Sequence, residues 1–401
     1  MSNEITNEPE IRFDGYEGDW EQRKWYDTVN MSTDMVDPKE GEYDDLPHIG
    51  PGNIESFTGR ILNNVKTVRE DNLISGKFHF NSGDIIYGKI NPQLAKYAYV
   101  NFEGLTSADT YVLKSHNGII QDFLFVILQT KDFYKYSVSV SMRTGMPKIN
   151  RDELNQYNYL SPSNIDEQRK IGSFFNQLDN TIALHQRELD LLEQLKQTYL
   201  QKMFPKTGED KPEIRFAGFT DAWEQHKIGD VFSERSERGS EGELISVTIN
   251  SGVIRASELD RKDNSSNDKS NYKKVKVGDI AYNSMRMWQG ASGYSSYNGI
   301  LSPAYTVIIP KEGIDSKFFA YDFKRYDMIQ TFKRNSQGLT SDTWNLKFPT
   351  LKSVKVMVPC IEEQKKISSF FERFNMTITL HQRELDSLKE MKKSLLQKMF
   401  A

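Results

Sequence analysis

Cysteine is almost absent from this chain of 401 residues, since Cys360 is the only one. A single thiol excludes an intramolecular disulfide and a thiolate cluster that could hold zinc or iron–sulfur. We therefore expect a reducing, cytoplasmic compartment. The sequence also lacks a basic-then-apolar leader and any apolar run of about eighteen residues, which argues against export and against a membrane-spanning helix.

Excess positive charge is missing too. The chain has 52 Lys and Arg against 56 Asp and Glu, a net charge of −4. A globally basic surface for polyanions is therefore excluded, and any contact with nucleic acid must be local. Such a local excess of positive charge exists between residues 85 and 151, which contain eight Lys and Arg but only four Asp and Glu.

Motifs for catalysis are not found either. The six histidines, at positions 48, 79, 116, 185, 226 and 381, have no metal-ligand spacing. No GxxxxGK[ST] phosphate loop occurs, and no GxGxxG follows an apolar run that could be a strand. We expect a chain that is not an enzyme, with no catalytic residues, no metal and no cofactor of its own.

What the chain does contain is a long internal duplication. Residues 166–204 match residues 362–400 at 23 of 39 positions without a gap, and both copies include LHQRELD. A second pair, PEIRFDGYEGDWEQ at 9–22 and PEIRFAGFTDAWEQ at 212–225, begins each half. A repeat of this length indicates two copies of one structural unit, each with its own divergent middle region.

The closing segment of each half predicts one long helix. Gly172 is its only glycine in either copy, proline is absent, and apolar residues recur at four-three spacing. Two such stripes in one chain are expected to pack against each other as a coiled coil. The predicted seam comprises Phe175, Leu178, Ile182, His185, Leu189 and Leu192, with Phe371, Ile378, His381, Leu385 and Leu388 in the second copy.

Polar residues interrupt this seam at His185 and His381 and at Lys196 and Lys392. Two interpretations remain open for them. Their long side chains can reach out of the edge of the seam, or they can fix the register between the helices.

Each middle region predicts an α/β domain. Short β-rich runs cover 84–87, 110–113, 304–309 and 354–358, and helical stretches cover 121–136 and 316–333. The segment PKTGEDKP at 205–212 has the composition of a connector.

The duplicated layout resembles the specificity subunit of a Type I restriction-modification system over nearly the whole chain. The resemblance rests on PEIRF and WE at the start of each half, and on GDI at 83–85 and 278–280 with SPAYTVI at 302–308. It rests also on the helix entries SPSNIDEQRKI at 161–171 and VPCIEEQKKI at 358–367.

This resemblance implies an architecture and a function. Each half would contribute a target recognition domain and a helix, and the two helices would pack antiparallel with a pseudo-two-fold repeat. Each domain would read one part of a split double-stranded DNA target, with the helices setting the distance between the parts. Because the middle regions diverge, the target should be asymmetric. Two methyltransferase subunits and two restriction subunits would join the complex and hold AdoMet, ATP and magnesium.

The corresponding domain boundaries are 1–163 and 205–358 for the recognition domains, with the conserved helices at 164–204 and 359–401. Candidate DNA contacts follow from residue type in loops, because Arg and Lys read guanine or hold phosphates and Asn and Gln read adenine. In the first domain they are Lys89, Asn91, Gln93, Lys96, Arg143, Lys148 and Arg151. In the second they are Arg286, Gln289, Arg334, Asn335, Gln337 and Ser341, with Lys269, Lys273 and Lys274 as phosphate contacts.

Two other functions compete with this one. The chain could be a coiled-coil assembly scaffold whose domains bind proteins, which would show no enriched DNA motif. It could also be a methyltransferase fused to its own recognition domain, which would bind AdoMet alone.

Overall fold

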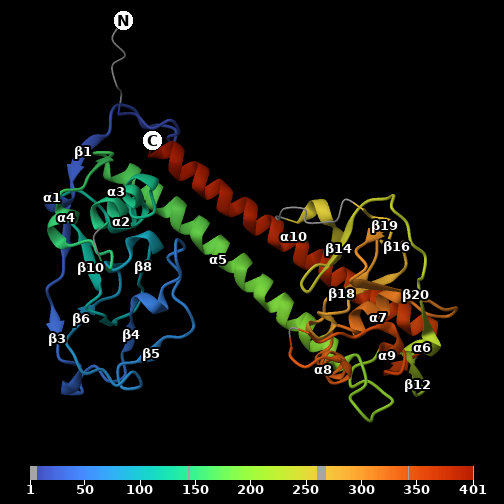
Figure 1. Ribbon diagram of the computed structural model, residues 1–401. Coiled ribbons are helices and arrows are strands. Elements are labelled where there is room, and N and C mark those ends of the chain that lie inside the picture. The colour runs from blue at the N-terminus through green and yellow to red at the C-terminus, as the bar shows by residue number, and fades with distance from the viewer. Residues whose placement is uncertain (1–6, 143–144, 260–267, 342, 401) are drawn as a thin grey trace, which may run out of the picture. The chain divides into compact units, whose positions relative to one another are not determined.

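A computed structural model describes residues 7–142, 145–259, 268–341 and 343–400 (Figure 1). The chain forms two compact units. The first contains residues 1–188 together with 382–401, and the second contains residues 189–381. Each unit therefore holds one divergent middle region. The first unit also holds the beginning of the long helix α5 (Ile165–Lys202) and the end of the long helix α10 (Ile361–Met399), and the second unit holds the end of α5 and the beginning of α10.

The first unit contains a four-stranded antiparallel sheet, a five-stranded mixed sheet and a two-stranded pair. In sheet order the strands are β2 (Val29–Met31), β10 (Thr110–Ser115), β7 (Ile85–Gly88) and β8 (Tyr97–Tyr99); then β3 (Met35–Val36), β6 (Lys77–Phe80), β9 (Gly104–Thr106), β4 (Pro47–Ile49) and β5 (Lys66–Thr67); then β1 (Glu21–Lys24) and β11 (Asn158–Ser161). Its helices are α1 (Trp25–Thr28), η1 (Pro38–Glu40), η2 (Pro51–Asn53), η3 (Pro92–Leu94), α2 (Gln121–Ile127), α3 (Lys131–Ser141) and α4 (Arg151–Asn155), with parts of α5 (Ile165–Lys202) and α10 (Ile361–Met399).

The second unit repeats the four-stranded sheet and the two-stranded pair and adds two further antiparallel pairs of strands. The strands are β13 (Phe232–Glu234), β20 (Tyr305–Pro310), β17 (Ile280–Asn283) and β18 (Ser292–Tyr294); then β14 (Ile245–Thr248) with β15 (Gly252–Arg255), β16 (Lys273–Val275) with β19 (Gly299–Leu301), and β12 (Glu224–Lys227) with β21 (Lys355–Val358). Its further helices are α6 (Ile228–Val231), η4 (Ala256–Glu258), η5 (Met287–Gln289), α7 (Ser316–Asp322), α8 (Tyr326–Asn335) and α9 (Phe348–Leu351).

The four-stranded sheet of each unit lies between two cores. Because side chains alternate along a strand, Ile85 and Tyr87 of β7 join the large core with α2 and α3, while Ile86 joins a smaller core with Ile49 and Phe80. In the second unit, Ile280 and Tyr282 of β17 face the large core and Ala281 the smaller one. Both faces of these strands are buried, so their sequences are continuous apolar runs and do not alternate between apolar and polar residues.

One predicted element is wrong in both halves. The helical stretches expected at 121–136 and 316–333 are each two helices, α2 and α3 in the first unit and α7 and α8 in the second. In the first unit the extended backbone of Thr130 ends the run, and its hydroxyl accepts a hydrogen bond from the Phe133 N–H at 3.3 Å, which starts α3 as an N-cap. In the second unit Arg325 takes the same extended backbone conformation before α8.

The duplicated motifs meet in each unit. Arg12 of the first PEIRF donates two hydrogen bonds to Glu167 of α5, at 2.8 and 2.9 Å, and Glu167 is only 1% exposed. Arg215 of the second PEIRF makes the same bidentate contact with Glu363 of α10, at 2.7 Å for both bonds. The repeated sequences therefore join the start of each half to the first turn of its closing helix.

The glutamine that follows each glutamate holds the helix to its sheet domain. The Gln168 amide donates to the carbonyls of Gly118 and Pro162 and accepts from the Ile120 N–H. Gln364 accepts from the Asp315 N–H at 2.9 Å. The helix also approaches α2 closely, since a Cβ at Gly172 would lie 2.5 Å from the Asp122 Cβ.

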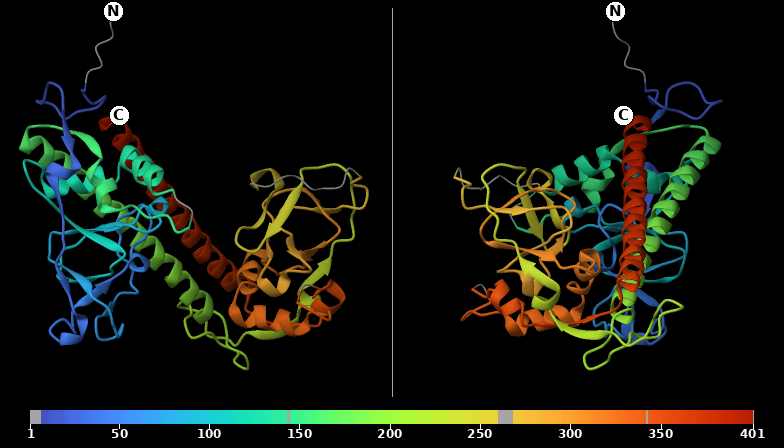
Figure 2. Two further views of the ribbon diagram at one scale, coloured as in Figure 1. Left: turned by 60° about the vertical axis from the view of Figure 1, so that its left-hand side comes forward. Right: turned by 90° about the vertical axis from the view of Figure 1, so that its right-hand side faces the viewer.

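The two long helices pack antiparallel, and this is visible within each unit. In the first unit the last turns of α10 lie beside α2 and the first turns of α5 (Figures 1 and 2), where Leu396 and Met399 share a core with Ile171 and Phe175. In the second unit Tyr199 near the end of α5 contacts Phe370 near the start of α10, with ring centroids 5.2 Å apart. The predicted fold class is confirmed.

Candidate nucleic-acid interface

In the first unit, candidate DNA contacts gather where two segments run antiparallel beside each other. The segments are residues 88–95, which run from β7 through η3, and residues 145–151. They are tied by the Asn91 N–H to the Pro147 carbonyl at 2.8 Å and by the Ile149 N–H to the Lys89 carbonyl at 3.0 Å. We call this the first reading loop cluster. Asn91 has a positive φ of 51°, which turns the chain here.

Lys89, Lys148 and Arg151 form the basic part of the first reading loop cluster. The Lys89 ammonium lies 5.4 Å from the centre of the Tyr111 ring, and the Arg151 guanidinium lies 6.0 Å from it. Burial lowers the pKa of Lys89, the positive charges of Lys148 and Arg151 lower it further, and the carboxylate of Asp109 partly opposes this shift. Three cations held this close together favour an anion beside them.

Some of the expected contacts are already used inside the protein. The Lys96 ammonium donates to the carbonyls of Pro51 and Ile54, both at 2.7 Å. Arg151 donates to the carbonyls of Met31 and Ser32. Gln93 is exposed and donates to Asn91 Oδ1 at 3.3 Å. Arg143 lies outside the described residues.

The second unit places its candidates at the equivalent position. Arg286 and Gln289 belong to the turn around η5, which packs against α8. Arg334 and Asn335 are the last residues of α8, and the chain continues into a loop. Gln337 closes this loop by pairing through its backbone with Asn345, and exposed Ser341 lies inside it. We call residues 285–290, 334–341 and 343–345 the second reading loop cluster.

Two tryptophans anchor the second reading loop cluster. The Trp288 and Trp344 rings meet edge to face with centroids 5.2 Å apart, and the Lys333 ammonium lies 5.7 Å from the centre of the Trp344 ring. The Trp288 indole N–H donates to the Met285 carbonyl at 3.0 Å. These contacts fix the turn around η5 to the loop after α8, so that polar residues on both segments lie together.

The three lysines expected to hold phosphates are placed differently. Lys273 lies 3.6 Å from a carboxylate oxygen of Glu234, and Lys274 lies 3.0 Å from one of Glu237. The carboxylates of Glu234 and Glu237 therefore compensate the charges of these two lysines. Lys269 is half-buried, and its carbonyl accepts from the Tyr272 N–H.

Exposed apolar side chains in the same loops were missed by reasoning from polar residue types. Leu94, Met142 and Met146 are exposed in the first unit, and Met285 and Leu339 in the second. A sequence signal exists in the methionines of SMRTGM at 141–146 and SMRMW at 284–288. Proteins that bind the minor groove use such side chains as wedges between base steps.

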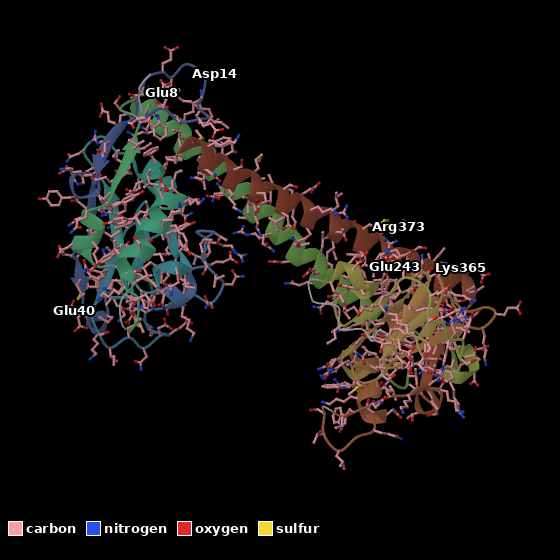
Figure 3. The ribbon with its side chains drawn as sticks, turned by 45° about the horizontal axis from the view of Figure 1, so that its top comes forward. Glu8, Asp14, Glu40, Glu243, Lys365 and Arg373 are labelled. Carbon is pink, nitrogen blue, oxygen red and sulfur yellow. The ribbon has the colours of Figure 1, made fainter. Side chains whose placement is uncertain are left out.

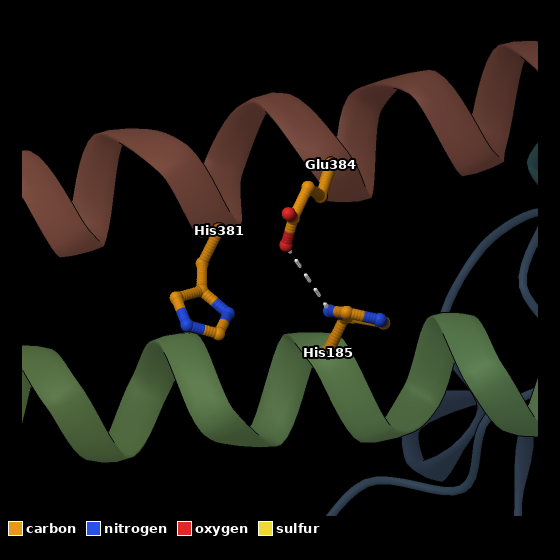
Figure 4. A group of neighbouring side chains, drawn as sticks. All are labelled: His185, His381 and Glu384. Atoms are coloured by element: carbon orange, nitrogen blue, oxygen red, sulfur yellow. Dashed lines mark ion pairs between the residues drawn. The ribbon is translucent and has the colours of Figure 1, made fainter.

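The residues of the predicted seam lie on the packed sides of α5 and α10. Phe175, Leu178 and Leu189 are buried in α5, as are Phe371 and Leu385 in α10. Ile182, His185, Leu192, Ile378, His381 and Leu388 are half-buried. His185 lies 4.0 Å from Glu384 across the two helices (Figure 4).

Both closing helices also present a duplicated outer surface. Lys170 lies 5.6 Å from the centre of the Tyr16 ring, and Lys366 lies 5.1 Å from the centre of the Phe219 ring, which the repeat aligns with Tyr16. Farther along, Leu184 of α5 and Leu380 of α10 occupy equivalent positions and are more than half exposed, at 55% and 56%. Figure 3 labels Lys365 and Arg373 along α10, which line a shallow pocket with Phe216 and Phe370.

A comparison with protein families decides which family these features represent. The model for the Type I restriction modification DNA specificity domain matches residues 18–194 and again residues 220–390. This chain belongs to that family. Type I specificity subunits are not enzymes, and the cofactors of the system reside on its methyltransferase and restriction subunits. The resemblance stated from the sequence is confirmed, and so is the function of a DNA specificity subunit.

Individual specificity subunits agree with the family. The chain is 30% identical over 189 residues to the Type I restriction enzyme EcoDI specificity subunit of Escherichia coli, a match that covers 46% of this chain and 41% of that subunit. It is 23% identical over 391 residues to the MjaVIII specificity subunit of Methanocaldococcus jannaschii, covering 90% of this chain and 86% of that subunit.

Solved structures share the fold. The crystal structure of a Type I restriction-modification S subunit from M. genitalium has a TM-score of 0.63 at 15% identity, covering 98% of this chain and 99% of that chain. A chain from work on complex assembly of the type I R-M system has a TM-score of 0.53 at 17% identity, covering 95% and 97%. Among the described residues of this specificity subunit, no helix has the length and apolar character that crossing a membrane requires.

Proposed function

We propose that this specificity subunit reads an asymmetric, bipartite DNA target, one part with each unit. The observation that carries the proposal is the equivalent placement of the two reading loop clusters. Each follows the central strands β7 or β17 and packs against α3 or α8. The donors differ, with Lys89 and Asn91 in the first unit and Arg286 and Gln289 in the second. Different donors at one position of a repeated fold favour different base sequences.

Within the clusters, polar side chains that are not buried are assigned to bases. Arg286 is exposed, and we assign it to a base edge in the second half of the target. In the first half we assign Asn91 and Gln93 to bases and Lys89 and Lys148 to phosphates, in keeping with their shared positive charge. Arg334, Asn335, Gln337 and Ser341 remain candidate contacts, and so do Lys269, Lys273 and Lys274.

Two copies each of the methyltransferase and restriction subunits are the proposed partners in the full complex. A duplicated surface offers the same docking site twice, and Leu184 with Leu380 and Lys170 with Lys366 give it equivalent apolar and basic residues. This surface lies on the repeated helices, so the sequence divergence of the two recognition domains does not alter it. We place the complex in the cytoplasm, in keeping with the single cysteine of the chain.

The proposed domain boundaries follow the duplication rather than the compact units. Residues 1–163 and 205–358 are the recognition domains, and 164–204 and 359–401 are the conserved helices. Each helix continues past the unit in which it begins, since the units divide at Leu189 and at Gln382. A helix shared in this way would fix the distance between the two parts of the DNA target.

The test is selection from random duplexes by this chain assembled with its methyltransferase subunit. The proposal expects one enriched motif made of two unlike parts separated by unread bases. Arg286→Ala should relax selection in one part alone and cost about 1–3 kcal/mol there. A motif whose two parts relax together, or no enriched motif, would count against it. The latter result would favour a protein-binding scaffold.

A further inference from the structure

The duplication offers an internal comparison at one place beside the paired helices. Three positions correspond between the units. Residue 179 of α5 corresponds to 375 of α10, residue 392 of α10 corresponds to 196 of α5, and residue 129 after α2 corresponds to 324 after α7. The surrounding fold is the same, but the charges are not.

In the first unit these positions are electrically balanced. The ammonium of Lys392, which is 9% exposed, forms an ion pair with the Asp179 carboxylate. The third member is the neutral amide of Gln129. Burial raises the pKa of Asp179, and its neighbours Lys392 and Gln129 oppose that rise. One positive and one negative charge thus meet away from water, with a net charge of zero.

In the second unit the same three positions carry two positive charges and no negative one. They are occupied by Lys196, Lys324 and Asn375. The Asn375 amide donates to the Tyr321 hydroxyl at 2.9 Å. Lys196 is close enough to Lys324 for its charge to lower the pKa of Lys324, which burial and this repulsion together bring to about 8.

Neither lysine has a counter-ion like Asp179 among the described residues. No carboxylate acts on Lys324. Glu193, one turn earlier on α5, acts on Lys196 too weakly to offset the burial that lowers the pKa of that lysine. Two partly buried ammonium groups side by side are unfavourable unless an anion joins them.

The geometry of Lys324 leaves a donor for such an anion. Its ammonium donates to the carbonyl of Ile249 at 2.7 Å and to the carbonyl of Gly290. An ammonium has three N–H groups, so one remains. Gly290 directly follows Gln289 in the turn around η5. Lys324 is therefore bonded to the second reading loop cluster and keeps one N–H donor unused.

We propose that Lys196 and Lys324 bind one phosphate of the DNA backbone next to the second reading loop cluster. The proposal rests on the proposed function and adds a contact that has no counterpart in the first unit. A phosphodiester suits the site because it brings a single negative charge and two unshared oxygens, one for each ammonium. A carboxylate from a partner subunit would meet the charge requirement but would not explain why Lys324 is bonded to the turn that carries Gln289.

The test compares salt dependence of DNA binding in two variants and a control. The probe is a duplex that carries the motif selected by the wild-type complex, and its affinity is measured by fluorescence anisotropy over a series of KCl concentrations. Lys196→Gln removes one charge. Asn375→Asp supplies the carboxylate that the first unit has at residue 179. The control Lys393→Gln removes an exposed lysine whose Nζ lies 3.6 Å from Glu390 on the same helix.

Loss of one phosphate contact should reduce the slope of log K against log [salt] by about 0.9. At roughly 0.1 M salt this corresponds to about eightfold weaker binding by the same relation. Lys196→Gln and Asn375→Asp should both show this change, and Lys393→Gln should not. Thermal melting of all three variants should match the wild type to within about 2 °C or show higher stability for Asn375→Asp, because that variant pairs a buried charge.

Three outcomes would overturn the proposal. Unchanged slopes and affinities in both variants, with the wild-type complex still selecting its motif, would remove the phosphate site and leave the proposed function intact. Weaker assembly with the methyltransferase subunit at an unchanged DNA slope would assign the lysines to a partner carboxylate. Failure of the wild-type complex to select any motif would overturn both.

Discussion

The bidentate pair between each PEIRF arginine and its helix glutamate gives the sharpest prediction for stability. We choose Glu167→Gln, which keeps the shape of the side chain and removes its charge. Arg12 then faces an amide that can accept only one of the two hydrogen bonds, now at 2.8 and 2.9 Å. The Trp20 indole N–H also loses a charged acceptor at 3.4 Å.

The magnitude follows from burial. Breaking a fully buried ion pair by removing one partner costs about 3–5 kcal/mol. The Arg12 side chain is 15% exposed and also donates to the Gly18 carbonyl, so part of its charge stays solvated. We expect a loss of about 2–3 kcal/mol, or roughly 5–10 °C in Tm for a unit of this size. Glu363→Gln should have a similar effect on the second unit.

The neighbouring residue supplies a matched control. Asp166 pairs with Arg169 on the surface of the same helical turn, with side chains 76% and 62% exposed. Asp166→Asn should therefore cost less than about 0.5 kcal/mol. Hydrogen exchange read by mass spectrometry would follow each unit separately, with protection falling in the first unit alone for Glu167→Gln. Equal effects of the two substitutions would refute the reasoning.

Three further predictions concern the helices and the lysine pair. Leu385→Asp puts a charge at a buried seam position and should destabilise the paired helices by about 4 kcal/mol or more, measured by denaturant unfolding. Leu184→Asp alters an exposed apolar position, so Tm should stay unchanged while the dissociation constant for the methyltransferase subunit rises at least about tenfold in a titration. Burial and the charge of Lys196, which Glu193 offsets only weakly, lower the pKa of Lys324 to about 8, so Lys324 loses its charge as pH rises through that value. DNA affinity should fall between pH 7 and 9, and Lys324→Gln should flatten the profile; a wild-type affinity that is constant over this range would contradict the assignment.

Much of the fold could be predicted from the sequence because duplication removes ambiguity. The helices at 166–204 and 362–400 were placed within a residue or two, since a strong apolar period over about 38 residues leaves no alternative element. The break at Thr130 was missed because both sides of it are helical by composition. Only the extended backbone of one residue and its capping hydroxyl separate α2 from α3, and such local signals are weak beside an apolar period.

The candidate site was predictable only in outline. Residue type selected loops that the structure brings together, as for Arg286 with Arg334, but it could not tell a free lysine from one already bonded. Lys96 and Lys274 are both occupied by acceptors from distant parts of the sequence. Lys324 was overlooked for the same reason. The role that we assign to Lys324 depends on Lys196 and Asn375, one earlier and one later in the chain, and each is more than fifty residues away from it.

The central claim is that two unlike loop clusters on a repeated frame read two unlike parts of one DNA target. Exchange of residues 285–290 and 334–345 for those of another specificity subunit, followed by selection from random duplexes by the complex with its methyltransferase subunit, tests it most directly. The account predicts that one part of the enriched motif changes while the other part and the number of unread bases stay the same. A motif that changes in both parts, or that does not change at all, would contradict it.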